Sequence, residues 1–465
     1  MQTKKQNLII FLIMGLFLGV LGAIHLLSAL AVAAVVCGVA MVLADNRRAL
    51  LALMLYVIID YGLRLAAPGI ATVWDELLML ALFALWLFKY FVNRREDCLK
   101  ATPLDIPILL YFAVNFFLLL AATPSFQIGV DGMRANVQFM LWYFIVTAFL
   151  KEKKDAWVLL NVLLVVGTLI GLHGCYQYLT GVPMPVSWVD NAETGIRTRA
   201  FSIIGSPNIL GSLMALLTPI SLALCLVDKN WLRKLMYFGM TGAMGGCVLF
   251  SMSRGAWIGF GAAVLVLVLF IDKRLLVPVA LLALFGAAMM PSVTSRILYM
   301  VSPEYIESSL RGGRLIRWQM GLDILSESPA FGAGLGHWGG AVAQNYEVMI
   351  KIRGGYVKSV YIDSYFMKLA AEGGITLVAT YLFLIYEQLI WCYKAVKAQT
   401  DAFYRYLTYG VFAGLVAVIV HNIMENVFEV PMMTTYFWIF AAILMHLLRL
   451  AQADAKPVDA PIAKA

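Results

Sequence analysis

Long runs of apolar residues recur along the whole chain and alternate with short polar segments. A helix needs about 20 predominantly apolar residues to span a bilayer. By that length, the sequence predicts about fourteen membrane helices, or about twelve if neighbouring short runs merge. Their starts lie near residues 7, 26, 49, 73, 104, 133, 156, 206, 234, 256, 275, 361, 407 and 432. The predicted fold class is an all-α, polytopic transmembrane helical bundle of about 12–14 helices.

The composition favours the same class. Of the 465 residues, 62% are hydrophobic and 13% are charged, whereas a soluble domain has about 25% charged residues. We therefore predict a single integral-membrane domain over residues 1–450. The Ala- and Pro-rich residues 451–465 are expected to form a disordered cytoplasmic tail.

The positions of Lys and Arg predict the orientation of the helices. Cytoplasmic loops carry an excess of these residues, and with a cytoplasmic N-terminus every second predicted loop is basic. The basic loops are residues 46–48, 89–100, 151–154, 229–234, 272–274 and 394–405. Both termini are therefore expected in the cytoplasm. The net charge of +8 comes from these loops, which favours contact with membrane lipids and argues against nucleic acid.

Cysteine chemistry and metal binding are not indicated. The six cysteines lie in or beside apolar runs, and they form no CxxC pair. A zinc site or a disulfide framework needs paired or closely spaced cysteines. We therefore predict no metal site.

One predicted outer loop is long enough to carry function. It spans residues 291–358, about 65 residues, and loops of this length in compact proteins are usually functional or disordered. Residues 314–325 have helical spacing that places Ile316, Met320 and Ile324 on one face. The loop is therefore expected to be ordered and partly helical.

The orientation rule predicts few arginines in the outer loops, so the arginines found there need an explanation. Guanidinium groups are permanently charged forks that suit phosphate, so these arginines suggest a lipid phosphate or diphosphate ligand. Contact with lipid headgroups or internal salt bridges are the alternatives. The outer arginines are Arg197, Arg199, Arg254, Arg311, Arg314 and Arg317.

The glycine-rich run at residues 332–336, followed by His337, looks superficially like a nucleotide-binding loop. It follows Pro329 instead of a predicted strand and opens no βαβ unit, so that interpretation fails. We expect a tight turn whose backbone N–H groups face an anion.

Acidic residues at the same predicted boundary offer a proton acceptor. Asp363 begins a late span and is either a general base toward a hydroxyl or a helix N-cap. Deeper in that span Lys368 and Glu372 are expected to pair, as Asp60 and Arg64 are in an earlier span. Three residues, His421, Glu425 and Glu429, are expected to be structural.

Four motifs in order resemble the O-antigen ligase and polymerase superfamily, bacterial enzymes of lipopolysaccharide and cell-surface polysaccharide biosynthesis. The resemblance covers residues 195–440 and includes the long outer loop before a late helix. The motifs are residues 199–201 with 207–208, residues 253–257, residues 317–318 and residues 329–336.

The resemblance implies an inverting membrane glycosyltransferase that acts at the outer face of the bacterial inner membrane. Its donor would be an undecaprenyl-diphosphate-linked glycan, and its acceptor a hydroxyl on a lipid- or glycan-borne molecule. No cofactor is implied. By the same resemblance, Arg199 and Arg254 would bind the donor diphosphate, with Arg197 as a substitute for the first.

One position departs from the family pattern. Ser364 and Gly374 fit the ligase spacing, but Asp363 occupies the place of the family histidine. Asp363 is therefore the candidate base, with His337 and His421 as alternatives. A polysaccharide polymerase of the same superfamily is the alternative to a ligase.

A solute transporter, similar to those linked to inorganic-carbon uptake, is the alternative from another class. A non-catalytic scaffold is a further one. Transporters place ionisable groups near the membrane midplane, next to broken helices. The distinctive charges of this sequence lie at the predicted outer boundary, which favours the transferase.

Overall fold

The computed structural model describes residues 46–93, 101–185, 188, 198–289 and 291–455. The helix starts predicted near residues 7 and 26 lie outside this range, as does Arg197. The chain divides into two compact units, which are described separately below. Unit 1 is Met1–Leu99 with Ala148–Leu163, and unit 2 is Lys100–Thr147 with Leu164–Ala465.

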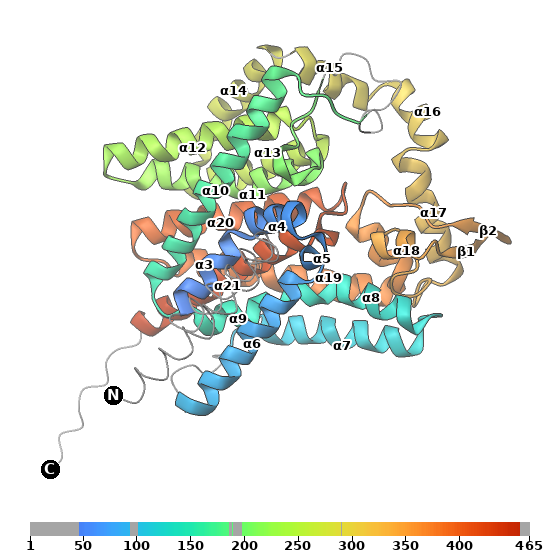
Figure 1. The fold of residues 1–465 in the computed structure, drawn as a ribbon. Coiled ribbons are helices and arrows are strands. Elements are labelled where there is room, and N and C mark those ends of the chain that lie inside the picture. The colour runs from blue at the N-terminus through green and yellow to red at the C-terminus, as the bar shows by residue number, and fades with distance from the viewer. Residues whose placement is uncertain (1–45, 94–100, 186–187, 189–197, 290, 456–465) are drawn as a thin grey trace, which may run out of the picture. The chain divides into compact units, whose positions relative to one another are not determined.

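The protein is a multi-pass membrane protein built from helices. Helices make up 79% of the structure, and six of those in the described ranges are long and apolar enough to cross a membrane. These are α10 (Lys153–Thr180), α11 (Pro207–Val227), α13 (Arg254–Ile271), α19 (Tyr365–Lys397), α20 (Ala402–His421) and α21 (Pro431–Ala455) (Figure 1). The predicted all-α polytopic class is confirmed, and the total of 12–14 helices stays a prediction.

Further helices occupy the other apolar runs of the described ranges. They are α3 (Asn46–Met54), α4 (Tyr56–Ala66), α5 (Pro68–Ala71), α6 (Trp74–Asn93), α7 (Asp105–Ala121), α8 (Phe126–Val137), α9 (Leu141–Phe149), α12 (Trp231–Phe250) and α14 (Leu276–Met289). The span predicted from residue 133 is broken, because the polar residues Asp131, Arg134 and Asn136 lie on α8 and a 3-10 turn separates α8 from α9.

Polar contacts connect α4 with α6 in unit 1. Tyr56 donates its hydroxyl hydrogen bond to Asp75 at 2.6 Å, and its ring lies 4.7 Å from that of Trp74. The indole N–H of Trp74 donates to Asp60 at 3.1 Å. Asp60 also pairs with Arg64 at 2.7 Å, which confirms that predicted pair.

Close backbone packing defines the centre of unit 2, where α11 is almost entirely buried. On α20, a Cβ at Gly414 would lie 2.2 Å from the Leu216 carbonyl oxygen, and one at Gly410 would lie 2.5 Å from Ile220 Cα. Glycine at both positions therefore lets the backbones of α11 and α20 approach closely. Small residues serve this purpose in membrane helices because lipid provides no hydrophobic drive between them.

The long loop of residues 291–358, which keeps the name outer loop below, is ordered and partly helical, as predicted. Its helices are α15 (Pro291–Met300), α16 (Pro303–Arg311), α17 (Arg314–Glu327) and α18 (Ala341–Asn345). A hairpin of β1 (Met349–Ile352) and β2 (Gly355–Lys358), which the sequence did not predict, pairs Met349 with Lys358. Its turn is held on α17, because Arg353 bonds Glu327 and Asp323 at 2.6 Å each.

Helix α19 is broken at Gly374, where φ is 61° and ψ is −160°. Such a break frees backbone groups that lipid cannot hydrogen-bond. The amides of Ile375 and Thr376 instead donate to the carbonyls of Pro329 and Ala330, at 2.8 and 3.3 Å. The carboxyl-terminal half of α19 therefore begins on protein acceptors from the outer loop.

The glycine-rich run provides hydrogen-bond donors for the backbone carbonyls that precede the break. The amides of Ala333 and Gly334 donate to the carbonyls of Ala371 and Glu372, at 2.8 and 2.9 Å. The next amide, of Leu335, donates to Thr123 Oγ1 at 3.3 Å. For these three amides the expectation that they face an anion is therefore wrong, because they donate to the helix break and to the α7–α8 connection.

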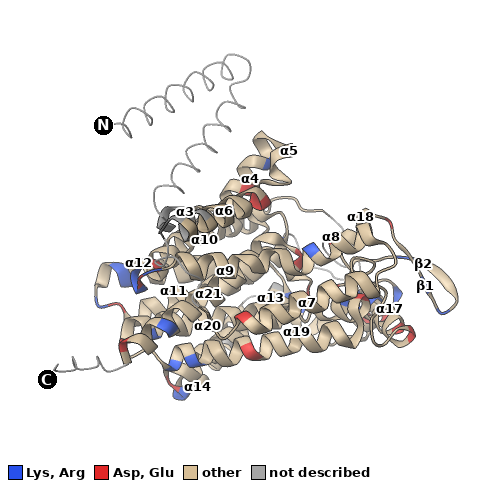
Figure 2. Ribbon diagram, turned by 90° about the horizontal axis from the view of Figure 1, so that it is seen from below, with Lys and Arg blue, Asp and Glu red and all other residues tan. Residues whose placement is uncertain are grey.

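The helices of unit 2 have one basic end. Figure 2 shows Lys and Arg gathered at the turns beside α12, α14 and α20, where the basic loops 229–234, 272–274 and 394–405 lie. At the other end α19 begins against the end of α20, because the Tyr365 amide donates to the Asn422 carbonyl at 3.0 Å. The basic loops and the long loop therefore lie at opposite ends of these helices.

Substitution of Gly374 by alanine should destabilise the protein by about 2–5 kcal/mol. The new Cβ would lie 2.5 Å from the Ala330 carbonyl carbon, and the positive φ disfavours any L side chain. Thermal unfolding of the detergent-solubilised protein measures the effect. Gly261→Ala is the control, because nothing lies within 4 Å of its Cβ position; an equal melting temperature for both variants would contradict the role of the break.

Candidate functional site

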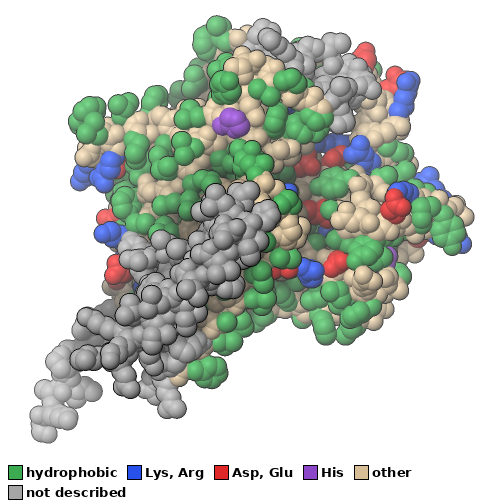
Figure 3. All heavy atoms as spheres, in the orientation of Figure 1, with side chains coloured by type: hydrophobic (Ala, Val, Ile, Leu, Met, Phe, Trp, Pro, Cys, Tyr) green, Lys and Arg blue, Asp and Glu red, His purple; other side chains and the backbone are tan. Residues whose placement is uncertain are grey.

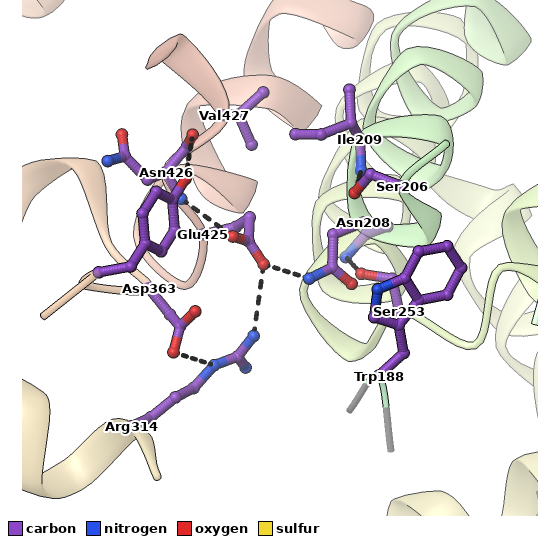
Figure 4. A network of polar contacts seen from close by, with 12 residues as sticks. Trp188, Ser206, Asn208, Ile209, Ser253, Arg314, Asp363, Glu425, Asn426 and Val427 are labelled. Carbon is purple, nitrogen blue, oxygen red and sulfur yellow. Dashed lines mark hydrogen bonds and ion pairs between the residues drawn. The ribbon is translucent and has the colours of Figure 1, made fainter. Parts of the chain in front are cut away.

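Distant parts of the chain converge at the end of unit 2 opposite the basic loops. Hydrogen bonds and ion pairs link them, and Figure 4 shows the part that runs from Asp363 through Arg314 and Glu425 to Asn208. Acidic and basic side chains also lie together in a recess of the face shown in Figure 3. The converging segments are residues 198–208, 251–255, 314–318, 361–365 and 421–429.

Arg199 is buried and holds the start of this network. Its side chain is 5% exposed. Nε donates to the Ser251 carbonyl at 3.0 Å, Nη1 to the Trp188 carbonyl at 2.9 Å, and Nη2 to Asn208 Oδ1 at 2.7 Å. The guanidinium therefore positions the turn that precedes α13 and the first residues of α11.

Asn208 connects Arg199 to the carboxylate and arginine side chains on the other side of the site. It follows Pro207 at the start of α11, where Ser206 caps the helix. Its amide nitrogen donates to Glu425 Oε2, and the same carboxylate oxygen lies 3.5 Å from Arg314 Nη2. Burial raises the pKa of the Glu425 carboxyl, and the Arg314 guanidinium opposes this shift.

Asp363 lies on the outer-loop side of the network. Its Oδ2 is 2.9 Å from Arg317 Nη1 and 3.7 Å from Arg314 Nε. The indole N–H of Trp318 donates to the Asp363 backbone carbonyl at 3.4 Å. The Arg317-Trp318 motif therefore holds both the carboxylate and the backbone of Asp363.

Asp363 is not the N-cap of α19. That position belongs to Ser364, whose side-chain oxygen accepts from the Met367 amide at 3.3 Å. The capping alternative for Asp363 is therefore wrong. The helix starts one residue later because Ser364 has the extended backbone of an N-cap, and this leaves the Asp363 carboxylate free to face the arginines.

Arg254 differs from Arg199 because part of its guanidinium is buried without a protein partner. Its Nη1 has no hydrogen-bond partner among the described residues. The guanidinium carbon lies 4.8 Å from the ring centre of Tyr305 and 6.0 Å from that of Tyr299. Arg254 is also the first residue of α13, after the N-cap Ser253, where the helix dipole adds positive potential.

The two histidines occupy different places. His421 ends α20 and lies beside Gly255, the residue after Arg254, because a Cβ on Gly255 would be 2.6 Å from its Cδ2. Its Nδ1 is buried without a hydrogen-bond partner in the described part of the chain. His337 lies in the glycine-rich run, where its Nδ1 is 2.8 Å from the Leu335 carbonyl. Burial lowers the pKa of His337, and this carbonyl opposes the shift.

The sequence located Arg199, Arg254, Arg314, Arg317 and Asp363 but not their partners. Asn208 and Glu425 connect the two sides of the site, and Glu425 was expected to be structural. A sequence signal for Glu425 existed, since a carboxylate inside an apolar stretch usually needs a cationic partner. The identity of that partner depended on the fold.

Asn208→Ala should destabilise the protein by about 1–3 kcal/mol, because Arg199 and Glu425 would each lose a buried partner. Thermal unfolding in detergent measures this loss. Asn345→Ala is the matched control, since Asn345 is exposed at the end of α18, and it should change stability by about 0.5 kcal/mol or less. Unchanged stability in Asn208→Ala would show that the network does not hold the site together.

The comparisons with known proteins give one match. The family model described as O-Antigen ligase matches residues 239–382, about a third of the chain. A search of curated proteins finds no match. The matched segment includes Arg254, the Arg317-Trp318 motif, the glycine-rich run and Asp363. The match supports the similarity to the O-antigen ligase and polymerase superfamily that the four motifs predicted.

Proposed function

We propose that this protein is an inverting glycosyltransferase. It transfers a glycan from undecaprenyl diphosphate to an acceptor hydroxyl at the outer face of the bacterial inner membrane. The observation that carries the proposal is Arg254 Nη1, which is buried and has no hydrogen-bond partner among the described residues, at the same end of unit 2 as a network of arginines and carboxylates. A cation with a free donor suits the diphosphate, and nearby carboxylates suit the acceptor.

Arg254 is the main donor ligand in this proposal. Charge grows on the diphosphate as the glycosidic bond breaks, and a donor already in place stabilises that charge without reorganisation. The Tyr305 and Tyr299 rings orient the guanidinium, and the start of α13 adds positive potential. Arg199 contributes by holding the Ser251 turn from which Arg254 projects.

Asp363 is the proposed base for the acceptor. The hydroxyl oxygen attacks the anomeric carbon, and the bond from that carbon to the diphosphate oxygen breaks on the opposite face. The bonding electrons leave with undecaprenyl diphosphate, and the hydroxyl proton passes to Asp363. Since Arg317 and Arg314 both contact Oδ2, Oδ1 is the atom proposed to accept the proton.

Ligase and polymerase differ only in the acceptor. A ligase transfers the glycan to a different lipid- or glycan-borne molecule, and a polymerase transfers it to another lipid-linked repeat. Glycan profiling of a deletion strain separates them. Loss of all glycan on the final acceptor indicates a ligase, whereas one remaining repeat unit indicates a polymerase.

A solute transporter is the second candidate, and one observation favours it. Helix α19 is broken at Gly374, and Lys368 and Glu372 are buried just before the break. Broken helices beside ionisable groups are typical of transporters. Purified protein that transfers glycan in detergent, where no transmembrane gradient exists, would favour the transferase over this candidate.

Arg254→Ala should lower the transfer rate about 10²–10³-fold, the usual cost of losing one preorganised donor. Arg254→Lys should recover only part of it, because a point charge replaces a fork. Arg233→Ala is the control: Arg233 is half-exposed at the basic end and pairs with Asp228 at 3.2 Å. Transfer is measured with purified protein and lipid-linked donor, and full activity in Arg254→Ala would remove this residue from the donor site.

Chelation of divalent ions should leave transfer unchanged within about twofold, because the arginines take the charge-stabilising role of a metal. The same purified assay, with and without EDTA, measures this. A strict requirement for Mg²⁺ or Mn²⁺ would contradict the proposed arginine site.

Asp363→Asn should abolish transfer with little loss of stability. The amide oxygen can still accept from Arg317, but the side chain no longer takes a proton. Asp363→His should restore part of the activity, because imidazole is a proton acceptor near neutral pH. Full activity in Asp363→Asn, with loss in His421→Gln or His337→Gln, would move the base to that histidine.

A further inference from the structure

A second charged cluster lies in unit 2, on helix α19 and the segment that follows α20. Lys368 and Glu372 stand one turn apart on α19, and Glu429 follows α20 in a short 3-10 turn. Lys368 Nζ is 3.1 Å from Glu429 Oε1 and 3.5 Å from Glu372 Oε2. The exposed fraction of the side chain is 1% for Lys368, 5% for Glu429 and 0% for Glu372.

The cluster has one cation for two carboxyl groups. If both carboxyls were ionised, the cluster would carry one uncompensated negative charge. An unpaired charge in such surroundings costs several kcal/mol, and a buried acid usually takes up a proton instead. Glu372 is eight positions beyond Ser364, about 12 Å along α19, and its side chain is completely buried, so water does not reach the charge.

The groups that face the cluster supply no further charge. α8 supplies Asn136, whose Oδ1 accepts from Lys368 Nζ at 3.0 Å, and α7 supplies Asn115 behind it. The neutral phenols around the cluster are Tyr111 on α7, Tyr365 on α19 and Tyr361 in the preceding loop. From the outer loop, the Ala341 amide donates to Glu429 Oε2 at 2.9 Å.

The two carboxyls are not equivalent. Glu429 has the shorter contact with Lys368 and accepts from a backbone amide, and both features stabilise a carboxylate. Glu372 lies farther from Lys368 Nζ, at 3.5 Å, its side chain is completely buried, and its other polar neighbour is the Gly336 amide. Of the two carboxyl groups, Glu372 therefore has the weaker contacts to stabilise its ionised form.

We propose that this cluster is a proton-binding site, in which Glu372 is a neutral carboxylic acid at neutral pH beside a Lys368–Glu429 ion pair. The bound proton removes the net negative charge without any other ligand. It also keeps the break in α19 intact, because the Glu372 backbone carbonyl accepts from Gly334 in the glycine-rich run. Loss of the proton would place a bare carboxylate beside that contact.

Glutamine tests the proposal because it has the shape of the neutral acid but cannot ionise. Glu372→Gln should keep the melting temperature within about 2 °C of the natural protein. Glu372→Gln combined with Glu429→Gln should lower it by more than about 5 °C, because Lys368 is then left without an anion. A fall in the single variant as large as in the double variant would overturn the proposal.

Infrared spectroscopy of the detergent-solubilised protein at neutral pH detects the proton directly. The natural protein should show the carbonyl stretch of a buried carboxylic acid above the amide band, and Glu372→Gln should lack it. Glu387→Gln, in the same helix, is the control and should leave the band unchanged. A band that persists in Glu372→Gln, or is missing from the natural protein, would overturn the proposal. Neither measurement depends on transfer activity, so either result leaves the proposed function to its own tests.

Discussion

The break in α19 is the constraint on which the rest of unit 2 depends. Within a membrane every backbone N–H and C=O needs a protein partner, because lipid offers none. At Gly374 the helix gives up its own hydrogen bonds, and residues 329–334 replace them. The outer loop is therefore attached to a membrane helix by hydrogen bonds between backbone groups. No substitution of a side chain can supply these hydrogen bonds in their place.

This attachment explains the position of the candidate site. The loop that closes the break follows α17 directly, and α17 carries Arg314 and Arg317. The same helix α19 begins just after Asp363. Because one end of α17 leads into the glycine-rich run, its arginines are held against the carboxylates that flank the starts and ends of α19 and α20.

Charge balance explains why the site and the buried cluster differ. At the candidate site, Arg314 is shared between Asp363 and Glu425, and Arg254 Nη1 has no hydrogen-bond partner in the part of the chain that the structure describes. Cations are in excess there, which suits an anionic substrate. At Lys368 the carboxyl groups outnumber the cations, so this cluster is not suited to bind an anionic substrate. A proton is the smallest ligand that restores neutrality.

The sequence by itself determined the features that depend on local composition. Runs of apolar residues revealed the class of fold, the spacing of residues 314–325 revealed α17, and the four motifs in order indicated the family whose model matches residues 239–382. Each of these is a property of neighbouring residues, since hydropathy, helical period and motif spacing are read along the chain. The pairs Asp60–Arg64 and Lys368–Glu372 were predictable for the same reason, because each is four positions apart.

The tertiary structure decided which distant residues meet. Asn208 and Glu425 are 217 positions apart, and Arg317 and Asp363 are 46 apart. No periodicity along the sequence links such residues. The sequence therefore predicted a structural role for Glu425 and left helix capping open as a role for Asp363. The glycine-rich run had the signature of an anion site, but its amides were taken by the break in α19. A hydrogen-bond donor binds whichever acceptor the packing brings to it, and packing is a property of the whole fold.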